Sequence, residues 1–350
     1  MSCCLTVIVP CYNGEKTLPR ALDSLISQTF LDFEVLIIND GSHDASGRIA
    51  DTFAARDSRF HVIHKPVNEG LSAGRNTGMA AASGRYITFL DCDDWLEPDI
   101  YEKMLASHSG ADIIVTGAYH DVWNQDGTLA VSTMDKTGIS MVSGDAKQIL
   151  HLSALLDEKR LFAYTWNKLY RREFLEENSF RFLNQTLIED FLFNCAVWGK
   201  ASSVELVDGC YYHYVKWSDE ALTQRYRPEY FEIMDKRYCA IRDLLNRDGE
   251  TDANDRVILG NMHIKHLLAG MIKNCSPKAG MTAKKRADVI HGILKSENCR
   301  QAVAYAKGKR LQEKVCNGLF ALGWVPLLRL FAAVLYRMQN SKGHFFDKLK

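Results

Sequence analysis

Three carboxylates stand directly after a strongly apolar segment near residue 90. Asp91, Asp93 and Asp94 follow residues 86–90 (YITFL), a run that is typical of a buried strand. Two acids one residue apart can point to the same side of an extended chain and offer the hard oxygen ligands that Mg²⁺ and Mn²⁺ prefer. The simpler interpretation is a strand end with solvated acids, before a helix that begins at Asp94 or Asp99. The motif alone therefore permits a divalent-metal site without requiring one.

The elements that would position these acids form an α/β pattern over the first 120 residues. The alternation of apolar runs with amphipathic stretches predicts a mostly parallel sheet flanked by helices. Strands are expected at residues 5–9, 33–39, 60–64, 86–90 and 112–116, and helices at 18–28, 45–56, 71–82 and 98–107. Ligands of such sheets bind beyond the carboxyl ends of the strands. Polar residues follow three of those ends, at 10–13, 39–42 and 91–94, so the site is expected there.

Asp40 ends the second expected strand and enters a turn that leads into a helix. Ser42 or Asp44 as the helix N-cap explains the turn without a ligand. Neither explains an acid at position 40, where the strand leaves the sheet near the expected site. A carboxylate there can accept the ring N–H of a uracil, and Tyr12 offers a ring face for stacking. For Tyr12 alone, core packing is the favoured alternative.

Arg75 lies in a glycine-rich stretch after the third strand, residues 68–78 (NEGLSAGRNTG). The glycines and Ser72 favour a helix start, and that role is sufficient to explain them. An arginine in the first turns works against the helix dipole, which favours acids at that end. An anionic ligand nearby would reverse this effect. Arg75 is therefore a candidate contact for a nucleotide.

Four segments together resemble the family 2 glycosyltransferases, which have the GT-A fold. They are residues 7–13 (VIVPCYN), 34–42 (EVLIINDGS), 68–76 (NEGLSAGRN) and 84–94 (GRYITFLDCDD). Each segment is a weak signal, and their order and spacing make the combination strong. The resemblance implies a Rossmann-like, mostly parallel sheet flanked by helices, followed by a helical C-terminal region.

The resemblance also implies a set of donor-binding residues. A nucleotide-sugar donor would be held by Pro10, Tyr12, Asp40, Arg75, Asp91 and Asp93. Residues 91–93 would form the D-x-D motif of the family, with Cys92 at its variable middle position. Asp93 would bind Mg²⁺ or Mn²⁺ directly, and Asp91 would contact the ribose or reach the metal through water.

On the acceptor side, residues 166–170 (WNKLY) resemble a segment that recurs in many bacterial members of the family. By this resemblance Trp166, Asn167 and Lys168 line the sugar and the acceptor. The alternative is an apolar segment whose Lys168 side chain reaches out to solvent.

Glu189 and Asp190 resemble the acidic pair that supplies the catalytic base in the family. Thr186 and Glu189 also have the spacing of a capping box, which would give Glu189 a purely structural role. Asp190 is then the carboxylate left for catalysis. A helix dipole lowers the pKa of an acid in the first turn and weakens it as a base, unless burial or nearby phosphates offset the effect.

His213 stands among three tyrosines, at positions 211, 212 and 214. It could contact a diphosphate or a metal, but a histidine in an aromatic cluster is more often packed in the core. We therefore favour the structural role.

The most apolar stretch near the C-terminus is residues 319–336, and Pro326 suits a helix start there. One face of that helix would carry Leu327, Leu330, Phe331, Val334, Leu335 and Met338. Arg329 makes it a poor membrane span. Basic residues flank this stretch and suit the surface of a bilayer: Lys307, Lys309, Arg310, Lys314, Arg337 and Lys342. Packing on the catalytic domain is the equal alternative.

Composition narrows the class of protein. The 350 residues are 47% hydrophobic and 25% charged, as in ordinary globular proteins, and the formal net charge of zero argues against a nucleic-acid surface. Ten scattered cysteines fit reduced thiols in the cytoplasm, and no signal peptide is expected. We expect a catalytic domain over residues 1–228, with a nucleotide-binding half at 1–120 and an acceptor-side half at 121–228, and a helical region over 229–350.

The sequence thus predicts an inverting, metal-dependent glycosyltransferase. It would move a sugar from a nucleotide-diphosphate donor, with UDP the favoured nucleotide, to a hydroxyl of a growing polysaccharide or lipid-linked saccharide. The expected location is the cytoplasm or the inner face of the cell membrane. A catalytically silent nucleotide-binding or scaffold protein of the same fold is the alternative. A nicotinamide dehydrogenase is disfavoured because no G-x-G-x-x-G follows the first strand.

Overall fold

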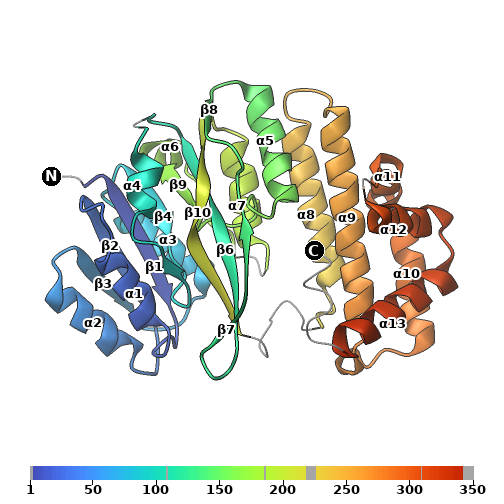
Figure 1. Cartoon of the computed structure of the whole chain (residues 1–350), viewed down its shortest axis with the longest axis horizontal. Coiled ribbons are helices and arrows are strands. Elements are labelled where there is room, and N and C mark those ends of the chain that lie inside the picture. Colours follow the sequence, from blue (N-terminus) through green and yellow to red (C-terminus); the bar gives the residue numbers. More distant parts are fainter. Residues whose placement is uncertain (1–2, 108, 185–186, 218–225, 309, 342–350) are drawn as a thin grey trace. The chain divides into compact units, whose positions relative to one another are not determined.

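The computed structural model describes residues 3–107, 109–184, 187–217, 226–308 and 310–341 (Figure 1). The chain groups into two compact units, residues 1–220 and 221–350. The expected catalytic domain, by comparison, ended at residue 228.

A mixed sheet is the framework of the N-terminal unit. Its strands are β1 (Leu5–Cys11), β2 (Phe33–Asp40), β3 (Phe60–Lys65), β4 (Tyr86–Phe89), β5 (Trp95–Leu96), β6 (Ile113–Trp123), β7 (Leu129–Asp135), β8 (Met141–Ser143), β9 (Lys168–Arg171) and β10 (Val204–Trp217). The main order is β3-β2-β1-β4-β9-β6-β10-β5, with β7 on β6 and β8 on β10. Strands β1 to β4 pair in parallel, and β9 is antiparallel to both of its neighbours. The carboxyl ends of β1, β2 and β4 therefore meet at one edge.

Helices cover both faces of this sheet. They are α1 (Leu18–Ile26), α2 (Ser46–Arg56), α3 (Leu71–Ala81), α4 (Ile100–Leu105), α5 (Ala146–Glu158), α6 (Arg172–Glu177) and α7 (Glu189–Trp198). All seven residues of β1 are buried, as expected for a central parallel strand. Val7 and Val9 share a core with α1, α2 and α4, whereas Ile8 faces α3 on the other side. Gly78 permits this approach, because a Cβ there would lie 2.4 Å from Cγ2 of Ile8.

The predicted α/β pattern of the first 120 residues is confirmed, with every expected strand and helix present. In residues 120–160, for which no element was predicted, β6 runs on to Trp123 and is followed by β7, β8 and α5. One expectation is wrong in detail: no helix begins at Asp94. The chain turns there into the short strand β5, and α4 begins at Ile100 without a side-chain cap from Asp99.

The C-terminal unit is helical, as expected. Its helices are α8 (Tyr230–Leu245), α9 (Ala253–Lys273), α10 (Ala283–Lys295), α11 (Glu297–Tyr305), α12 (Leu311–Leu322) and α13 (Val325–Ser341), with a 3₁₀ turn at Pro277–Ala279. The long helix α9 contacts each of the other five helices. Among the described residues, no helix combines the length and the apolarity needed to span a bilayer.

Candidate active site

The loops after β1 and β2 interlock at the carboxyl edge of the sheet. The backbone N–H of Asn13 donates to Oγ of Ser42 at 3.0 Å, and Oδ1 of Asn13 accepts from the N–H of His43 at 2.9 Å. Asn13 has a φ of +50°, a left-handed conformation that asparagine tolerates well. The arrangement leaves Tyr12 44% exposed, edge-on to His43 at 6.4 Å between ring centroids. Core packing of Tyr12 is therefore wrong, and its ring is accessible for stacking.

Asp40 is buried at the end of β2 and held by three donors. Nζ of Lys65 lies 2.7 Å from Oδ1, and the N–H of Gly70 donates to Oδ2 at 2.8 Å. The N–H of Glu69 is shared between the two oxygens at 3.1 and 3.2 Å. Gly41 has a φ of +67°, and a Cβ there would lie 2.6 Å from the backbone of Val67, so the β2 end and the β3–α3 loop touch. Asp40 thus shapes the start of α3 in addition to any contact with a base.

The helix-cap explanation of the β2 turn is wrong in detail. The N-cap of α2 is Ala45, which makes no side-chain cap hydrogen bond. Asp44 instead accepts from the N–H of Ser46 at 2.9 Å and from the N–H of Glu15 at 3.0 Å. Its carboxylate therefore joins the loop to the start of α1 as well as to α2.

The acids after β4 have different environments. Asp94 is fully buried and accepts from Oη of Tyr212 at 2.6 Å and from the N–H of Val215 at 2.8 Å, so it anchors the turn to β10. The Asp93 side chain reaches solvent, although its carboxylate is largely surrounded by protein atoms. Desolvation by the surrounding protein, together with the charge of Asp91, raises the pKa of Asp93 to about 6. A carboxylate that is difficult to ionise is one that a bound cation would stabilise.

Arg20 was not identified from the sequence. Its Nη2 donates to the backbone carbonyl of Asp93 at 2.6 Å, and its guanidinium lies 5.4 Å from the ring centroid of Trp123. The arginine comes from α1, more than seventy residues earlier, so no local pattern connects it with the acids. It holds the turn through a main-chain atom and leaves the Asp93 carboxylate open.

The two acids fit a metal only in part. Within the described residues, no three His, Cys, Asp or Glu side chains are grouped closely enough to hold one ion. Asp91 and Asp93 would supply at most two carboxylates. This donor set suits Mg²⁺ or Mn²⁺, which commonly bind one or two carboxylates and take further oxygens from substrate phosphates and water.

Arg75 connects two predicted parts of the site. It is 1% exposed, and its Nη2 pairs with Oδ1 of Asp91 at 2.9 Å while its Nη1 pairs with Asp190. Its guanidinium also lies 5.3 Å from the ring centroid of Phe182 and 5.8 Å from that of Phe89. The carboxylates raise the pKa of Arg75 against the opposing effect of burial. The unfavourable position of Arg75 near the positive end of the α3 helix dipole is therefore compensated by Asp91 and Asp190 of the protein itself.

Asp190 lies in the first turn of α7 and is enclosed by protein. Oδ2 accepts from the hydroxyl of Thr165 at 3.2 Å, and Oδ1 carries the ion pair to Arg75. Burial raises the pKa of Asp190, and Arg75 opposes that rise. The expected weakening by the helix dipole is therefore offset by burial.

Glu189 does not serve as a helix cap. The N-cap of α7 is Ile188, which makes no side-chain cap hydrogen bond, so the expected capping role of Glu189 is wrong. Thr186, the other member of the expected capping box, lies outside the described residues. Oε2 of Glu189 is buried and has no hydrogen-bond partner among the described atoms. Burial and the neighbouring charge of Asp190 raise the pKa of Glu189. Among the described residues, no hydrogen bond to Oε2 explains the position of this side chain.

Asn167 and Lys168 point into the protein. Lys168 is 0% exposed, and its Nζ donates to the carbonyls of Leu161, Phe162 and Tyr164 and to Oδ1 of Asn167. Nδ2 of Asn167 donates to the carbonyls of Thr116 and Leu161. The alternative in which the Lys168 side chain reaches out to solvent is therefore wrong. Both side chains hold the loop over residues 161–165, which carries Thr165 and thus contacts Asp190.

Trp166 belongs to an aromatic stack. Its ring lies 4.1 Å from that of Tyr212 and 4.5 Å from that of Tyr164, both nearly parallel to it. Tyr212 in turn accepts a hydrogen bond from the N–H of Asp91 at 3.3 Å. The stack connects the 161–165 loop with the acidic turn.

His213 is a packed histidine, as the sequence favoured. Its ring is stacked between Trp95 and Tyr119, with centroids at 3.5 and 4.4 Å. One ring nitrogen lies 2.8 Å from Asp121 and the other 3.0 Å from Glu97. Neither nitrogen is left for a ligand.

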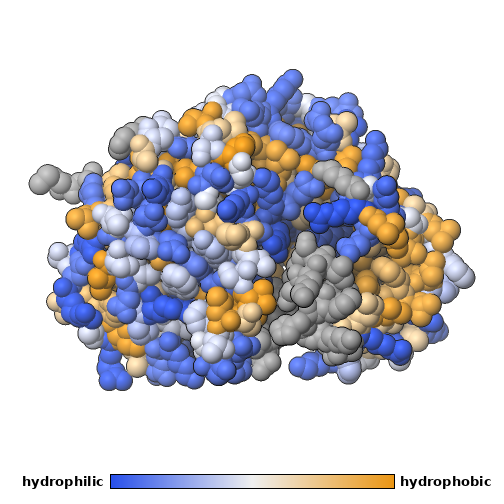
Figure 2. Space-filling view, viewed as in Figure 1, coloured by the Kyte–Doolittle hydropathy of each residue, from blue (hydrophilic) through white to orange (hydrophobic). Residues whose placement is uncertain are grey.

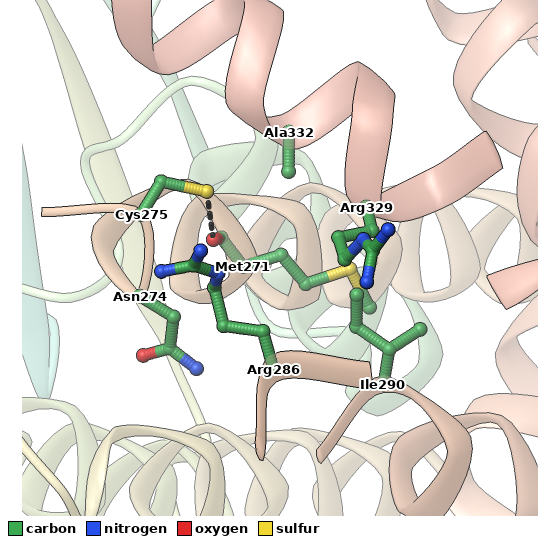
Figure 3. Close-up of a pocket in the computed structure, with 7 residues that line it drawn as sticks. All are labelled: Met271, Asn274, Cys275, Arg286, Ile290, Arg329 and Ala332. Atoms are coloured by element: carbon green, nitrogen blue, oxygen red, sulfur yellow. Dashed lines mark hydrogen bonds between the residues drawn. The ribbon is translucent and has the colours of Figure 1, made fainter. Parts of the chain in front are cut away.

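A pocket in the C-terminal unit contains none of the predicted site residues (Figure 3). It is lined by Met271, Asn274, Cys275, Arg286, Ile290, Arg329 and Ala332. Both arginines donate to backbone carbonyls, Arg286 to Met281 at 2.8 Å and Arg329 to Ala283 at 3.3 Å. Their guanidinium groups therefore serve the helix ends of this unit.

Comparison with known proteins agrees with this architecture. The model of the family "Glycosyl transferase family 2" matches residues 6–179. EpsJ of Bacillus subtilis (strain 168), an uncharacterized glycosyltransferase, is 31% identical over 327 residues, which cover 89% of this chain and 92% of that protein. EpsH of the same organism is 37% identical over 231 residues, 65% of each chain. The chain therefore belongs to the family 2 glycosyltransferases and is an enzyme of that class.

Solved structures show the fold. S. aureus TarS 1–349 in complex with UDP-GlcNAc superposes with a TM-score of 0.62 at 19% identity, over 98% of this chain and 93% of that one. The same protein in complex with UDP gives a TM-score of 0.61. The predicted GT-A fold is confirmed.

Proposed function

We propose that this enzyme transfers a sugar from a UDP-sugar to a hydroxyl of a saccharide acceptor, with inversion at the anomeric carbon. The observation that carries the proposal is the double ion pair of Arg75, which fixes the D-x-D acid Asp91 and the candidate base Asp190 in one site. The UDP and UDP-GlcNAc bound to TarS, which shares the fold, support the choice of nucleotide.

The donor would lie along the carboxyl ends of β1, β2 and β4. The exposed ring of Tyr12 is available to stack on the base, with Pro10 beside it and Asp40 at the end of the next strand. Asp93 would hold a Mg²⁺ or Mn²⁺ ion directly, and Asp91 would contact the ribose or reach the metal through water. When bound, such an ion would supply charge neutralisation for the departing diphosphate. Arg75 orients Asp91 for that task.

Asp190 would take the proton from the acceptor hydroxyl as the sugar is transferred. Its raised pKa makes it a stronger base than an exposed aspartate, and Arg75 keeps it ionised. Glu189 adds a second carboxyl next to it, of which Oε2 is buried. Trp166, Asn167 and Lys168 are all buried, so they would act on the acceptor side by positioning the loop that carries Thr165.

Binding of UDP and Mn²⁺ tests the donor site. Thermal unfolding of the wild type and of Asp93→Ala is measured with UDP, GDP, CDP and TDP, each with and without Mn²⁺. A ligand at about a hundred times its dissociation constant adds roughly 2.7 kcal/mol, a shift that is easily seen. We expect a Mn²⁺-dependent shift with UDP that Asp93→Ala loses.

Asp32→Ala, an exposed carboxylate in the same unit, is the matched control and should keep the shift. The absence of any nucleotide shift would overturn the donor assignment. UDP binding without turnover of UDP-sugars on any saccharide acceptor would favour the silent scaffold.

We also propose that α12 and α13 contact an anionic membrane surface, where a lipid-linked acceptor of a cytoplasmic enzyme would be found. Seven large apolar side chains of this region are exposed: Leu311, Val315, Leu322, Trp324, Leu330, Val334 and Met338. Apolar atoms gather over the C-terminal helices in Figure 2. On α13, residues 330, 334 and 338 form the exposed stripe, whereas Leu328 and Ala332 are buried and the helix packs against α9 and α10.

The charge of this region suits acidic lipids. Residues 307–338 contain six Lys or Arg residues and one acid, Glu313, although the whole chain has a formal net charge of zero. Lys309 and Lys342 lie outside the described residues.

We expect the protein to sediment with phosphatidylglycerol vesicles, less strongly in high salt, and not to sediment with phosphatidylcholine vesicles. Trp324→Ser should reduce sedimentation with phosphatidylglycerol vesicles, and Leu31→Gln, which alters an exposed apolar residue of the other unit, should not. Equal sedimentation of the two variants would contradict the proposal.

A further inference from the structure

Two cysteines face each other across neighbouring strands at the active-site edge. Cys11 is the last residue of β1, and Cys92 is the middle residue of the acidic turn after β4. β1 and β4 pair in parallel, with Leu5 opposite Tyr86 and Ile8 opposite Phe89. The N–H of Leu90 continues this ladder by donating to the carbonyl of Ile8 at 3.0 Å. The same register, continued beyond the end of β4, would bring Cys92 toward Cys11.

The two sulfur atoms converge on one point above Gly14. A Cβ at Gly14 would lie 3.0 Å from Sγ of Cys11 and 3.1 Å from Sγ of Cys92. Adjacent strands are about 4.8 Å apart, within the range of roughly 4.4–6.8 Å between Cα atoms that a disulfide bridges. Residues that lie opposite each other on paired strands are therefore at a spacing that a disulfide can bridge.

We propose that Cys11 and Cys92 form a reversible disulfide that controls the acidic turn. Both thiols are free in the structure, Cys11 buried and Cys92 partly exposed. An oxidant can therefore reach Cys92, and Cys11 is the thiol placed to resolve the product. The bond itself does not depend on the proposed function, whereas its effect on donor binding does.

A low-molecular-weight disulfide such as oxidised glutathione is the oxidant. The sulfur of Cys92 attacks one glutathione sulfur, so the glutathione S–S bond breaks and the first glutathione leaves as its thiol. The sulfur of Cys11 then attacks Sγ of Cys92, forms the protein S–S bond and releases the second glutathione. The two thiol protons of the protein pass to the two glutathione thiols, and two electrons move from the protein to the oxidant.

The bond would act on both acids that flank Cys92. An S–S bond of about 2.05 Å draws the turn toward β1, because the two thiols are not bonded to each other in the structure. Asp91 is tied to Arg75 through its side chain, and Asp93 is tied to Arg20 through its carbonyl. A displacement at position 92 therefore changes the carboxylate geometry on each side. We expect the oxidised protein to bind UDP with Mn²⁺ at least tenfold more weakly.

Peptide mapping tests the disulfide directly. The full-length protein is incubated with mixtures of reduced and oxidised glutathione, blocked with an alkylating agent, digested and analysed by mass spectrometry. We expect a peptide pair linked through Cys11 and Cys92, with a mass about 2 Da below the sum of the two reduced peptides. Thiol reduction should restore both peptides. Cys275→Ser, which alters a thiol of the C-terminal unit, should leave the link intact.

Cys92→Ser and Cys11→Ser should each abolish the link. If the buried Cys11→Ser variant does not fold, Cys92→Ser and the wild-type map still decide the matter. Alkylation of both cysteines without any linked peptide, under conditions that oxidise other thiols of the chain, would overturn the proposal. UDP and Mn²⁺ binding by the reduced protein is measured in parallel: its failure would reject the donor site and leave the disulfide standing.

Discussion

The guanidinium of Arg75 and the carboxylate of Asp190 form a partly buried ion pair across 115 positions of the sequence. Arg75 lies on α3, next to the strands expected to hold the nucleotide, and Asp190 begins the helix expected to face the acceptor. The second arm of the same guanidinium holds Asp91. One cation therefore fixes the distance between the donor side and the candidate base.

Removal of that cation should destabilise the N-terminal unit. Arg75→Met leaves the partly buried Asp91 and Asp190 without a counter-charge, and the loss of one partner of a fully buried ion pair, about 3–5 kcal/mol, sets the upper limit of the cost. Urea unfolding followed by tryptophan fluorescence measures it, because five of the six tryptophans lie in residues 1–220. Arg56→Met, an exposed arginine of α2, is the control and should change stability little. A loss below about 1 kcal/mol for Arg75→Met would show that the acids find other partners.

Asp190→Asn should separate catalysis from binding. The amide keeps the size of the side chain but cannot accept a proton, so kcat should fall by about 10²–10⁴. The dissociation constant for UDP with Mn²⁺ should remain close to that of the wild type, in contrast to Asp93→Ala. Turnover is measured with saturating donor, and binding by calorimetry. Full turnover by Asp190→Asn would refute the assignment of the base and direct attention to Glu189.

Metal affinity should depend on the ionisation of Asp93. Its pKa of about 6 predicts that Mn²⁺-dependent UDP binding weakens as the pH falls through that value. The stability of the metal-free protein has the opposite pH dependence. The pKa of Asp93 in the folded protein lies above the unfolded value of about 3.9, so protonation of Asp93 favours folding. The stabilising contribution is complete below about pH 3.9 and is lost as the pH rises through about 6.

Asp93→Asn provides the matched measurement. The variant should have a higher melting temperature than the wild type at pH 7.5 without metal, and this difference should shrink toward pH 4. It should gain no stability from Mn²⁺ and UDP at any pH. A metal-free difference that does not vary with pH would mean that Asp93 is ionised normally in the folded protein.

The sequence predicts the elements of this site better than the contacts between them. Runs such as residues 33–39 specify a buried strand locally, and the polar residues that follow identify the edge where ligands bind. The pairing of Arg75 with Asp190 and that of Arg20 with the Asp93 carbonyl depend on the tertiary fold, so no local spacing reveals them. Lys168 was expected to reach solvent for the same reason. A lysine normally extends to solvent, and its sequence neighbours do not reveal the acceptors that surround it in the folded protein.

Lys168 should therefore act through the loop that it holds. Lys168→Met keeps the apolar stem but leaves the carbonyls of Leu161, Phe162 and Tyr164 without this donor, and a buried unsatisfied group costs about 1–3 kcal/mol. Because Thr165 in that loop donates to Asp190, we expect kcat to fall while KM for the donor changes little. Lys147→Met, an exposed lysine on α5, is the control. A Lys168→Met enzyme with a lower melting temperature but an unchanged kcat would show that the loop can loosen without disturbing the base, and Asp190 would then depend on Arg75 alone.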